Sequence, residues 1–162
     1  RVLGLGYPGV PQIQKTALEG NETAYKFPKV SFDENLDFSF SGVKTAVINF
    51  LHKAEQQGVE LNKADIAASF QDAVTDVLCE HTIEAAKKYN SKIIALAGGV
   101  ASNSDLRGKM TEWAKKEGID VIYPSPIYCT DNAAMIAEAG FYEFEKGKFA
   151  ELDLNAVPSL QL

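Results

Sequence analysis

Two segments of the sequence carry the residue types from which phosphate and metal sites are built. In the first, 96–103, Gly98 and Gly99 follow a short apolar run and precede an expected helix. Glycines let the backbone approach a ligand closely, and free N–H groups at a helix start attract phosphate. A tight strand-to-helix turn in which Asn103 caps the helix explains the same residues, so two glycines alone leave both interpretations open.

The second segment, 129–135, holds Asp131 shortly after another apolar run. Asp131 is either the N-cap of the next helix, a very common role, or a carboxylate ligand for a divalent metal. If both apolar runs are strands of one parallel sheet, their carboxyl ends share an edge, which favours the ligand. Lys44, in 39–45, is a weaker candidate for a phosphate or RNA contact, since such lysines are more often simply hydrated.

The histidines and cysteines form no recognisable catalytic set. His52 and His81 are 29 positions apart and lack metal-ligand spacing. His81 continues an apolar stripe and is expected to be a satisfied core residue, whereas His52 is expected to be exposed. Cys79 is expected to be inert packing, and Cys129 is a candidate for reactivity only if it is exposed. Two cysteines without close spacing fit a reducing cytosol.

The hydrophobic pattern predicts the elements that position these residues. Helices are expected at 11–19, 43–57, 62–89, 103–117 and 131–146, and strands at 38–40, 93–97 and 120–123. Loop and short strands are expected over 21–37, a break at 41–42, and an N-cap at Asn62. The order helix, strand, helix, strand, helix from residue 62 predicts an α/β fold. Its parallel strands are expected to be buried, with ligands at their carboxyl ends.

Composition narrows the class of protein. The 162 residues fit about one domain, and a hydrophobic fraction of 46% allows a sizeable core. With 16 basic and 22 acidic residues, the formal charge of −6 argues against a generally basic nucleic-acid surface and leaves a local one open. No apolar run approaches the about 20 residues of a membrane span. The chain opens without Met or a signal peptide, which predicts a piece of a longer protein.

Five ordered segments resemble the C-terminal half of the TsaD family, also called YgjD or Gcp and once described as O-sialoglycoprotein endopeptidase. They read GYPG at 6–9, FSFSGVKTAV at 38–47, ASFQ at 68–71, AGGVASN at 97–103 and CTDNAAMIA at 129–137. The resemblance implies one lobe of the actin, Hsp70 and sugar kinase fold over 1–150, with a central mixed sheet flanked by helices. An irregular tail over 151–162 would follow, and the N-terminal lobe would be absent.

The resemblance also implies a function and a site. The family transfers a threonylcarbamoyl group from threonylcarbamoyl-AMP to N6 of the adenosine beside the tRNA anticodon, in the cytoplasm with TsaB and TsaE. By similarity, Gly9, Gly98, Gly99 and Asn103 would contact the adenine nucleotide. Asp131 would be one ligand of a divalent metal, iron or zinc, whose other ligands are the histidines of an H-x-x-x-H motif.

This sequence departs from the family pattern in two respects. Val10 stands where the family usually has a second glycine and would crowd a ligand that touches this backbone. The H-x-x-x-H pair is absent, and a single carboxylate does not hold a transition metal tightly. We therefore expect the chain alone to be inactive, to bind metal weakly and to self-associate through exposed apolar area. A metallopeptidase and a non-catalytic nucleotide-binding or scaffold lobe are the alternatives.

Overall fold

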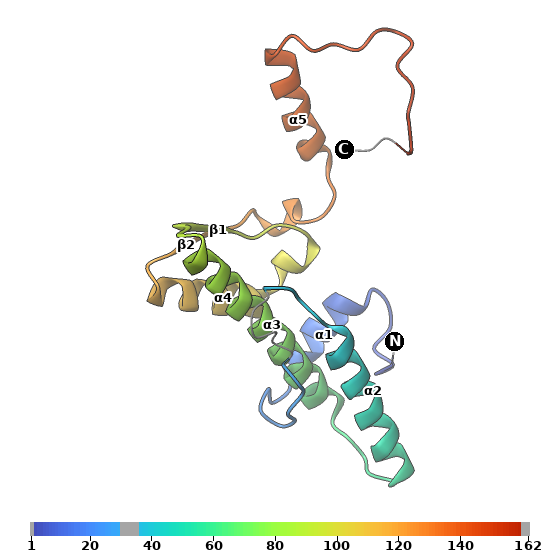
Figure 1. Ribbon diagram of the computed structural model, residues 1–162. Helices are drawn as coiled ribbons and strands as arrows, with labels where there is room; N and C mark the ends of the chain where they lie inside the picture. Colours follow the sequence, from blue (N-terminus) through green and yellow to red (C-terminus); the bar gives the residue numbers. More distant parts are fainter. Residues whose placement is uncertain (1, 30–35, 160–162) are drawn as a thin grey trace. The chain divides into compact units, whose positions relative to one another are not determined.

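The computed structural model describes residues 2–29 and 36–159 of the chain. The chain divides into two compact units, Arg1–Cys129 and Thr130–Leu162. The first unit holds the helices α1 (Gly9–Ala17), α2 (Ser41–Gln56), α3 (Lys63–Lys88) and α4 (Ser104–Lys116), the strands β1 (Ile93–Ala95) and β2 (Asp120–Ile122), and the 3-10 turns η1 (Gly99–Ser102) and η2 (Pro126–Tyr128) (Figure 1). The second unit holds α5 (Ala133–Glu145).

The sheet of the first unit is a parallel pair in which Ile93 lies opposite Asp120 and Ala95 opposite Ile122. Helices α3 and α4 pack on one face of the pair, where Ile94 is 6% exposed. Ile93 and Ile122, which alternate with the covered positions, are each 55% exposed. The predicted parallel sheet is confirmed. The prediction of strands buried on both faces is wrong for the described residues, because helices cover one face only.

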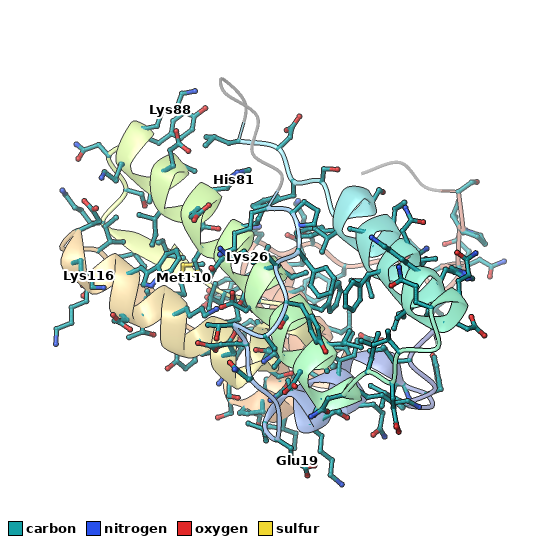
Figure 2. The ribbon with its side chains drawn as sticks, turned by 90° about the horizontal axis from the view of Figure 1, so that it is seen from below. Glu19, Lys26, His81, Lys88, Met110 and Lys116 are labelled. Carbon is teal, nitrogen blue, oxygen red and sulfur yellow. The ribbon has the colours of Figure 1, made fainter. Side chains whose placement is uncertain are left out.

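The core that supports the sheet lies between α3 and α4. Residues at three- and four-residue steps face each other there, as the apolar periodicity predicts for two amphipathic helices. Met110 is 1% exposed and lies between the two helices in Figure 2. The buried members of this core are Cys79, Ile83, Ala86, Ile94, Leu106, Met110, Ala114 and Ile119.

Helices α1 and α2 pack against the first half of α3. Val43 and Val47 of α2 are buried with Ile66 of α3 in a second core. Gly20, which follows α1, lies so close to α3 that an added Cβ would stand 2.1 Å from the carbonyl oxygen of Ala64. A side chain does not fit at this contact, so glycine is required by the packing of the chain on α3.

The ends of the helices confirm some predictions and correct others. Asn62 caps α3 as predicted, since its side chain accepts a hydrogen bond from the Ala64 N–H at 2.9 Å. The predicted break at 41–42 is wrong, because these residues form the first turn of α2. The strand predicted at 38–40 is absent, as residues 36–40 pair with no described strand. Residues 21–29 likewise contain no strand, and 30–35 lie outside the described residues.

The second unit consists of α5 and an irregular segment. α5 begins at Ala133, two residues later than predicted, and contains no buried residue. Residues 150–159 contain turns but neither helix nor strand. The division at Cys129 differs in place from the predicted tail at 151, and the predicted lobe over 1–150 stays a prediction. None of the helices in the described ranges combines the length and hydropathy that a membrane crossing requires.

Candidate functional site

The glycine turn follows β1 directly and adopts a conformation that requires glycine. Gly98 has φ 87° and ψ 170°, a region open almost only to glycine. An added Cβ at Gly98 would meet nothing within 4 Å, so the backbone conformation, not packing, demands the residue. The predicted turn is present, but the turn η1 separates Gly98 from α4, so the glycines do not open the helix directly as expected.

Asn103 ends this turn and caps α4. Its Oδ1 accepts a hydrogen bond from the Leu106 N–H at 2.9 Å, and its Nδ2 donates to Gln71 Oε1 at 2.9 Å. The side chain is buried, with 6% exposure. The capping role considered for Asn103 is confirmed. Its role as a nucleotide contact stays a prediction, and one Nδ2 hydrogen is left to serve it.

Two cavities lie at the carboxyl end of β1. A cavity of about 420 Å³ is lined by Phe40, by Val74 and Leu78 of α3, and by residues of the turn that include Ala97 and Val100. A smaller cavity of about 240 Å³ is lined by residues at the carboxyl ends of the two strands: Ala95, Leu96, Ile122, Tyr123 and Pro124. The carboxyl edge of the sheet is therefore hollowed where ligands of parallel sheets bind.

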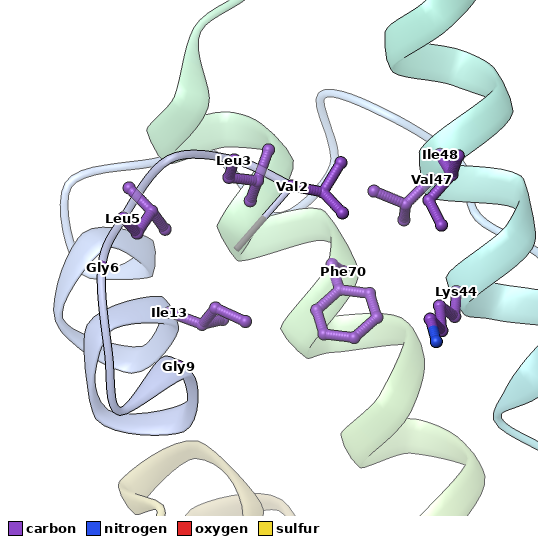
Figure 3. Close-up of a pocket in the computed structure, with 10 residues that line it drawn as sticks. All are labelled: Val2, Leu3, Leu5, Gly6, Gly9, Ile13, Lys44, Val47, Ile48 and Phe70. Atoms are coloured by element: carbon purple, nitrogen blue, oxygen red, sulfur yellow. The ribbon is translucent and has the colours of Figure 1, made fainter.

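Gly9 and Lys44 border one apolar pocket of about 170 Å³, lined also by Val2, Leu3, Leu5, Gly6, Ile13, Val47, Ile48 and Phe70 (Figure 3). Gly9 begins α1 after the cis Tyr7–Pro8 peptide. Lys44 is exposed and forms no ion pair within the described residues. Phe70 of α3 lines this pocket, and the next residue of the helix, Gln71, binds Asn103. The role of Lys44 as an anion contact stays a prediction.

Val10 lies on the outer side of α1. Its side chain is 52% exposed. The helix that carries it contacts the start of α4, where Gln14 Nε2 donates a hydrogen bond to Ser104 Oγ at 3.3 Å. The crowding expected from Val10 concerns a bound ligand and stays a prediction.

Asp131 lies in the second unit, two residues after Cys129. The N-cap of α5 is Asn132, whose Oδ1 accepts a hydrogen bond from the Ala134 N–H at 3.1 Å, so the capping role considered for Asp131 is wrong. Its exposed carboxylate makes no hydrogen bond or ion pair with any described residue. No group of three or more His, Cys, Asp or Glu side chains among the described residues is placed to hold a metal. Asp131 fits a metal as a single ligand.

Arg107 joins the two turns, and sequence reasoning missed it. Its Nε donates a hydrogen bond to the Ala101 carbonyl oxygen of η1. Its Nη2 donates to the Pro124 carbonyl oxygen at 3.0 Å and to Cys129 Sγ at 3.1 Å. The guanidinium carbon lies 4.3 Å from the centre of the Tyr123 ring. A cation in the first turn of a helix opposes the helix dipole, and this was the available signal in the sequence.

A cluster of charged side chains joins α3 to α4. Lys109 Nζ donates one hydrogen bond to Asp72 Oδ1 and one, at 2.8 Å, to Asp76 Oδ1, both on α3. Lys29 pairs with Asp76 from the segment before α2. Burial disfavours the charge of Lys109 and the charge of Asp76, but their mutual hydrogen bonds and charges outweigh it. The pKa of Lys109 is raised and that of Asp76 lowered.

The remaining reactive side chains are buried. Cys79 is fully buried, and burial raises the pKa of its thiol to about 12, so the prediction of inert packing is confirmed. Cys129 is 1% exposed and does not meet the exposure condition set for its reactivity. His52 is exposed as predicted. His81 is buried as predicted, but its Nδ1 has no hydrogen-bond partner among the described residues, which departs from the satisfied core residue that was expected.

These features define an α/β protein with a small parallel sheet, helices on one face and a glycine turn at the carboxyl edge. The fold is shared with a crystal structure of T. kodakarensis HypF, at a TM-score of 0.57 and 23% identity, over 86% of this chain and 18% of that one. The model of the family described as TsaD, tRNA N6-adenosine threonylcarbamoyltransferase, matches residues 1–138. The chain belongs to the TsaD family.

Curated relatives agree with this assignment. Proteins of Clostridium perfringens (strain SM101) and Clostridium botulinum (strain Kyoto), each named tRNA N6-adenosine threonylcarbamoyltransferase, are 55% identical to the whole chain. The chain spans 48% of the length of each of these relatives. The family resemblance read from the five segments is confirmed.

Proposed function

We propose that this chain is part of an enzyme that transfers a threonylcarbamoyl group from threonylcarbamoyl-AMP to N6 of the adenosine beside the tRNA anticodon. The family match over residues 1–138 is the observation that carries the proposal. In the whole protein the chain would form one lobe of the actin, Hsp70 and sugar kinase fold. Since the chain spans 48% of its relatives, the activity belongs to the longer protein.

The glycine turn is the proposed adenylate contact. The backbone of Gly98 and Gly99 would face the nucleotide, Asn103 would bond it through its remaining Nδ2 hydrogen, and Gly9 would border it. The open space at Gly98 and the hollowed carboxyl edge of β1 support these roles. Fixed backbone donors beside a leaving phosphate stabilise its charge without reorganising during the reaction.

Asp131 is the proposed contribution of this chain to the metal site. Its exposed carboxylate has no competing partner among the described residues, which suits a ligand of iron or zinc. A bound metal supplies Lewis-acid polarisation of a carbonyl or phosphate oxygen. Asp131 would act as a ligand and not as a general base. The histidines of the family motif would supply the other protein ligands from outside this chain.

The reaction fits a cytoplasmic enzyme that meets tRNA, TsaB and TsaE. The N6 nitrogen of the adenosine would attack the carbonyl carbon of threonylcarbamoyl-AMP, the bond to the adenylate oxygen would break, and N6 would lose a proton.

The formal charge of −6 makes a broad tRNA-binding face on this chain unfavourable. The tRNA contact would therefore be local or shared with the rest of the protein.

Reconstitution of the reaction tests the proposed function. The longer protein would be incubated with TsaB, TsaE, tRNA and threonylcarbamoyl-AMP, and the nucleosides analysed by mass spectrometry. We expect threonylcarbamoyladenosine with the longer protein and none with the 162-residue chain alone. Cleavage of a protein substrate without tRNA modification would favour the metallopeptidase. Nucleotide binding without either reaction would favour a scaffold lobe.

The isolated chain is also proposed to self-associate. Apolar side chains of α5 and the segment after it are exposed, among them Ile136 at 74%, Phe144 at 63% and Phe149 at 71%. Apolar patches of this kind favour association in water. Sedimentation velocity across a dilution series would show concentration-dependent assembly, which Ile136→Ser should weaken. A monomer at every concentration would contradict the proposal.

A further inference from the structure

We propose that Arg107 is a positioning residue that locks the turn after β1 to the loop after β2. Through it, the turn that carries the glycines proposed to face the nucleotide and the loop 124–129 would hold one fixed relation within the first unit. The inference rests on the proposed function for what the two turns bind. The lock itself consists of contacts between residues of this chain and does not depend on that function.

The contacts of Arg107 come from three points of the chain. Nε donates a hydrogen bond to the carbonyl oxygen of Ala101, which lies in η1 two residues after Gly99. Nη2 donates to Pro124 at 3.0 Å, two residues after the end of β2, and to Cys129 Sγ at 3.1 Å. Cys129 is the last residue of the first unit, so all three contacts lie within that unit.

The geometry requires arginine and not merely a positive charge. A guanidinium presents several N–H donors in one plane, and here they reach acceptors on separate segments while the plane lies against Tyr123. A lysine ammonium is a point charge on a flexible stem and cannot hold these acceptors together. Nε and Nη2 bind the protein itself, so Arg107 acts through the turns and not on the reacting atoms.

Cys129 reports directly on this lock. Its thiol is 1% exposed and lies against Arg107 Nη2, whereas Cys79 is fully buried in the core between α3 and α4. Loosening of the lock should expose Cys129 and leave Cys79 protected. Loss of the whole core should expose both. The chain contains no other cysteine, so the two thiols can be followed separately by mass spectrometry.

The test labels the native 162-residue chain and its variants Arg107→Lys and Arg107→Met with a thiol reagent. Lys116→Met, at an exposed position of the same helix, is the matched control. We expect Cys129 to react about tenfold faster or more in both Arg107 variants, the factor that follows from losing a hydrogen bond to a charged group. Cys79 should stay protected in every variant, and the control should behave as the parent chain.

Two results would overturn the lock. Unchanged protection of Cys129 in both variants would mean that Arg107 holds nothing there. Equal labelling of Cys79 and Cys129, in Arg107→Lys as well as Arg107→Met, would mean that Arg107 supports the whole core and has no specific positioning role.

The longer protein then tests what the lock positions. In Arg107→Lys we expect the affinity for adenine nucleotide to fall about tenfold, the factor that follows from losing a hydrogen bond to a charged group. Lys116→Met should leave this affinity unchanged. If the parent protein modifies no tRNA and binds no nucleotide, the proposed function fails while the labelling result stands. If the parent is active and Arg107→Lys keeps its nucleotide affinity, the positioning role fails alone.

Discussion

Removal of the Lys109 ammonium is the most informative perturbation of the scaffold beneath the site. Lys109→Met keeps the length of the side chain and its packing along α4 but removes the charge that faces Asp72, Asp76 and Asp105. The three carboxylates would then stand together, and among the described residues Lys29 would still pair with Asp76 and Asp72. Because α3 and α4 together carry Gln71 and Asn103, loss of this cluster would also loosen the glycine turn.

The exposure of the partners sets the size of the effect. The side chain of Lys109 is 17% exposed, that of Asp76 11% and that of Asp72 24%, so the cluster lies between a surface pair and a buried one. Surface pairs contribute about 0–1 kcal/mol, and breaking a buried pair costs about 3–5 kcal/mol. Since Lys29 still serves Asp76, we expect a loss of about 2 kcal/mol in the free energy of unfolding.

Urea unfolding followed by fluorescence measures this loss. Trp113, the one tryptophan of the chain, packs against the core between α3 and α4 and reports on its integrity. Lys116→Met removes the partner of Glu112 at a site where both side chains are about two-thirds exposed, and should leave the free energy of unfolding unchanged. An equal, small effect of the two substitutions would refute the view that the Lys109 cluster holds the two helices together.

Three further predictions follow from the same scaffold. The folded state lowers the pKa of Asp76, so the unfolded chain binds more protons at acid pH. Stability that is present above about pH 4 should therefore be lost as the pH falls further. In acid titrations, Asp76→Asn should flatten this dependence. Gly20→Ala should cost about 1–3 kcal/mol because its Cβ meets an α3 carbonyl, whereas Gly108→Ala, where a Cβ meets nothing, should be neutral or stabilising in thermal unfolding. In urea unfolding, Asn103→Ala should cost about 1–2 kcal/mol, because it removes a helix cap and also leaves Gln71 Oε1 without its donor. Asn62→Ala removes a cap alone and should cost less. Equal costs would contradict a stabilising role of the Asn103–Gln71 hydrogen bond.

The helices and the parallel pair of strands could be predicted from the sequence because each has a cause in neighbouring residues. The apolar steps along α3 and α4, the Asn62 cap and the short apolar strands each have a local cause that the structure retains. The strand expected at 38–40 failed because alternation alone does not supply a neighbouring strand. In the structure the rings of Phe38 and His81 stack at 5.4 Å, a contact between positions that no local pattern relates.

The sequence predicted which kinds of residue form the candidate site, but not the contacts that hold them in place. The turn at Gly98 and Gly99 was predicted from its place between a strand and a helix, and Gly98 has a positive φ of 87° there. The contacts of Arg107 and Lys109 were missed, because most of them join residues 17 to 37 positions apart and depend on how α3, α4 and the loops meet. The capping role considered for Asp131 failed because its neighbour Asn132 offers an equally good cap.

The central claim, that this chain brings a metal ligand and a nucleotide turn to a threonylcarbamoyl transferase, is tested most directly by one substitution in the longer protein. Asp131→Asn would be compared with Asp153→Asn, an exposed carboxylate of the same unit. Metal content and tRNA threonylcarbamoyladenosine would be measured on the same samples. We predict that Asp131→Asn loses both while Asp153→Asn keeps both. Full metal content and full modification with Asp131→Asn would contradict the account.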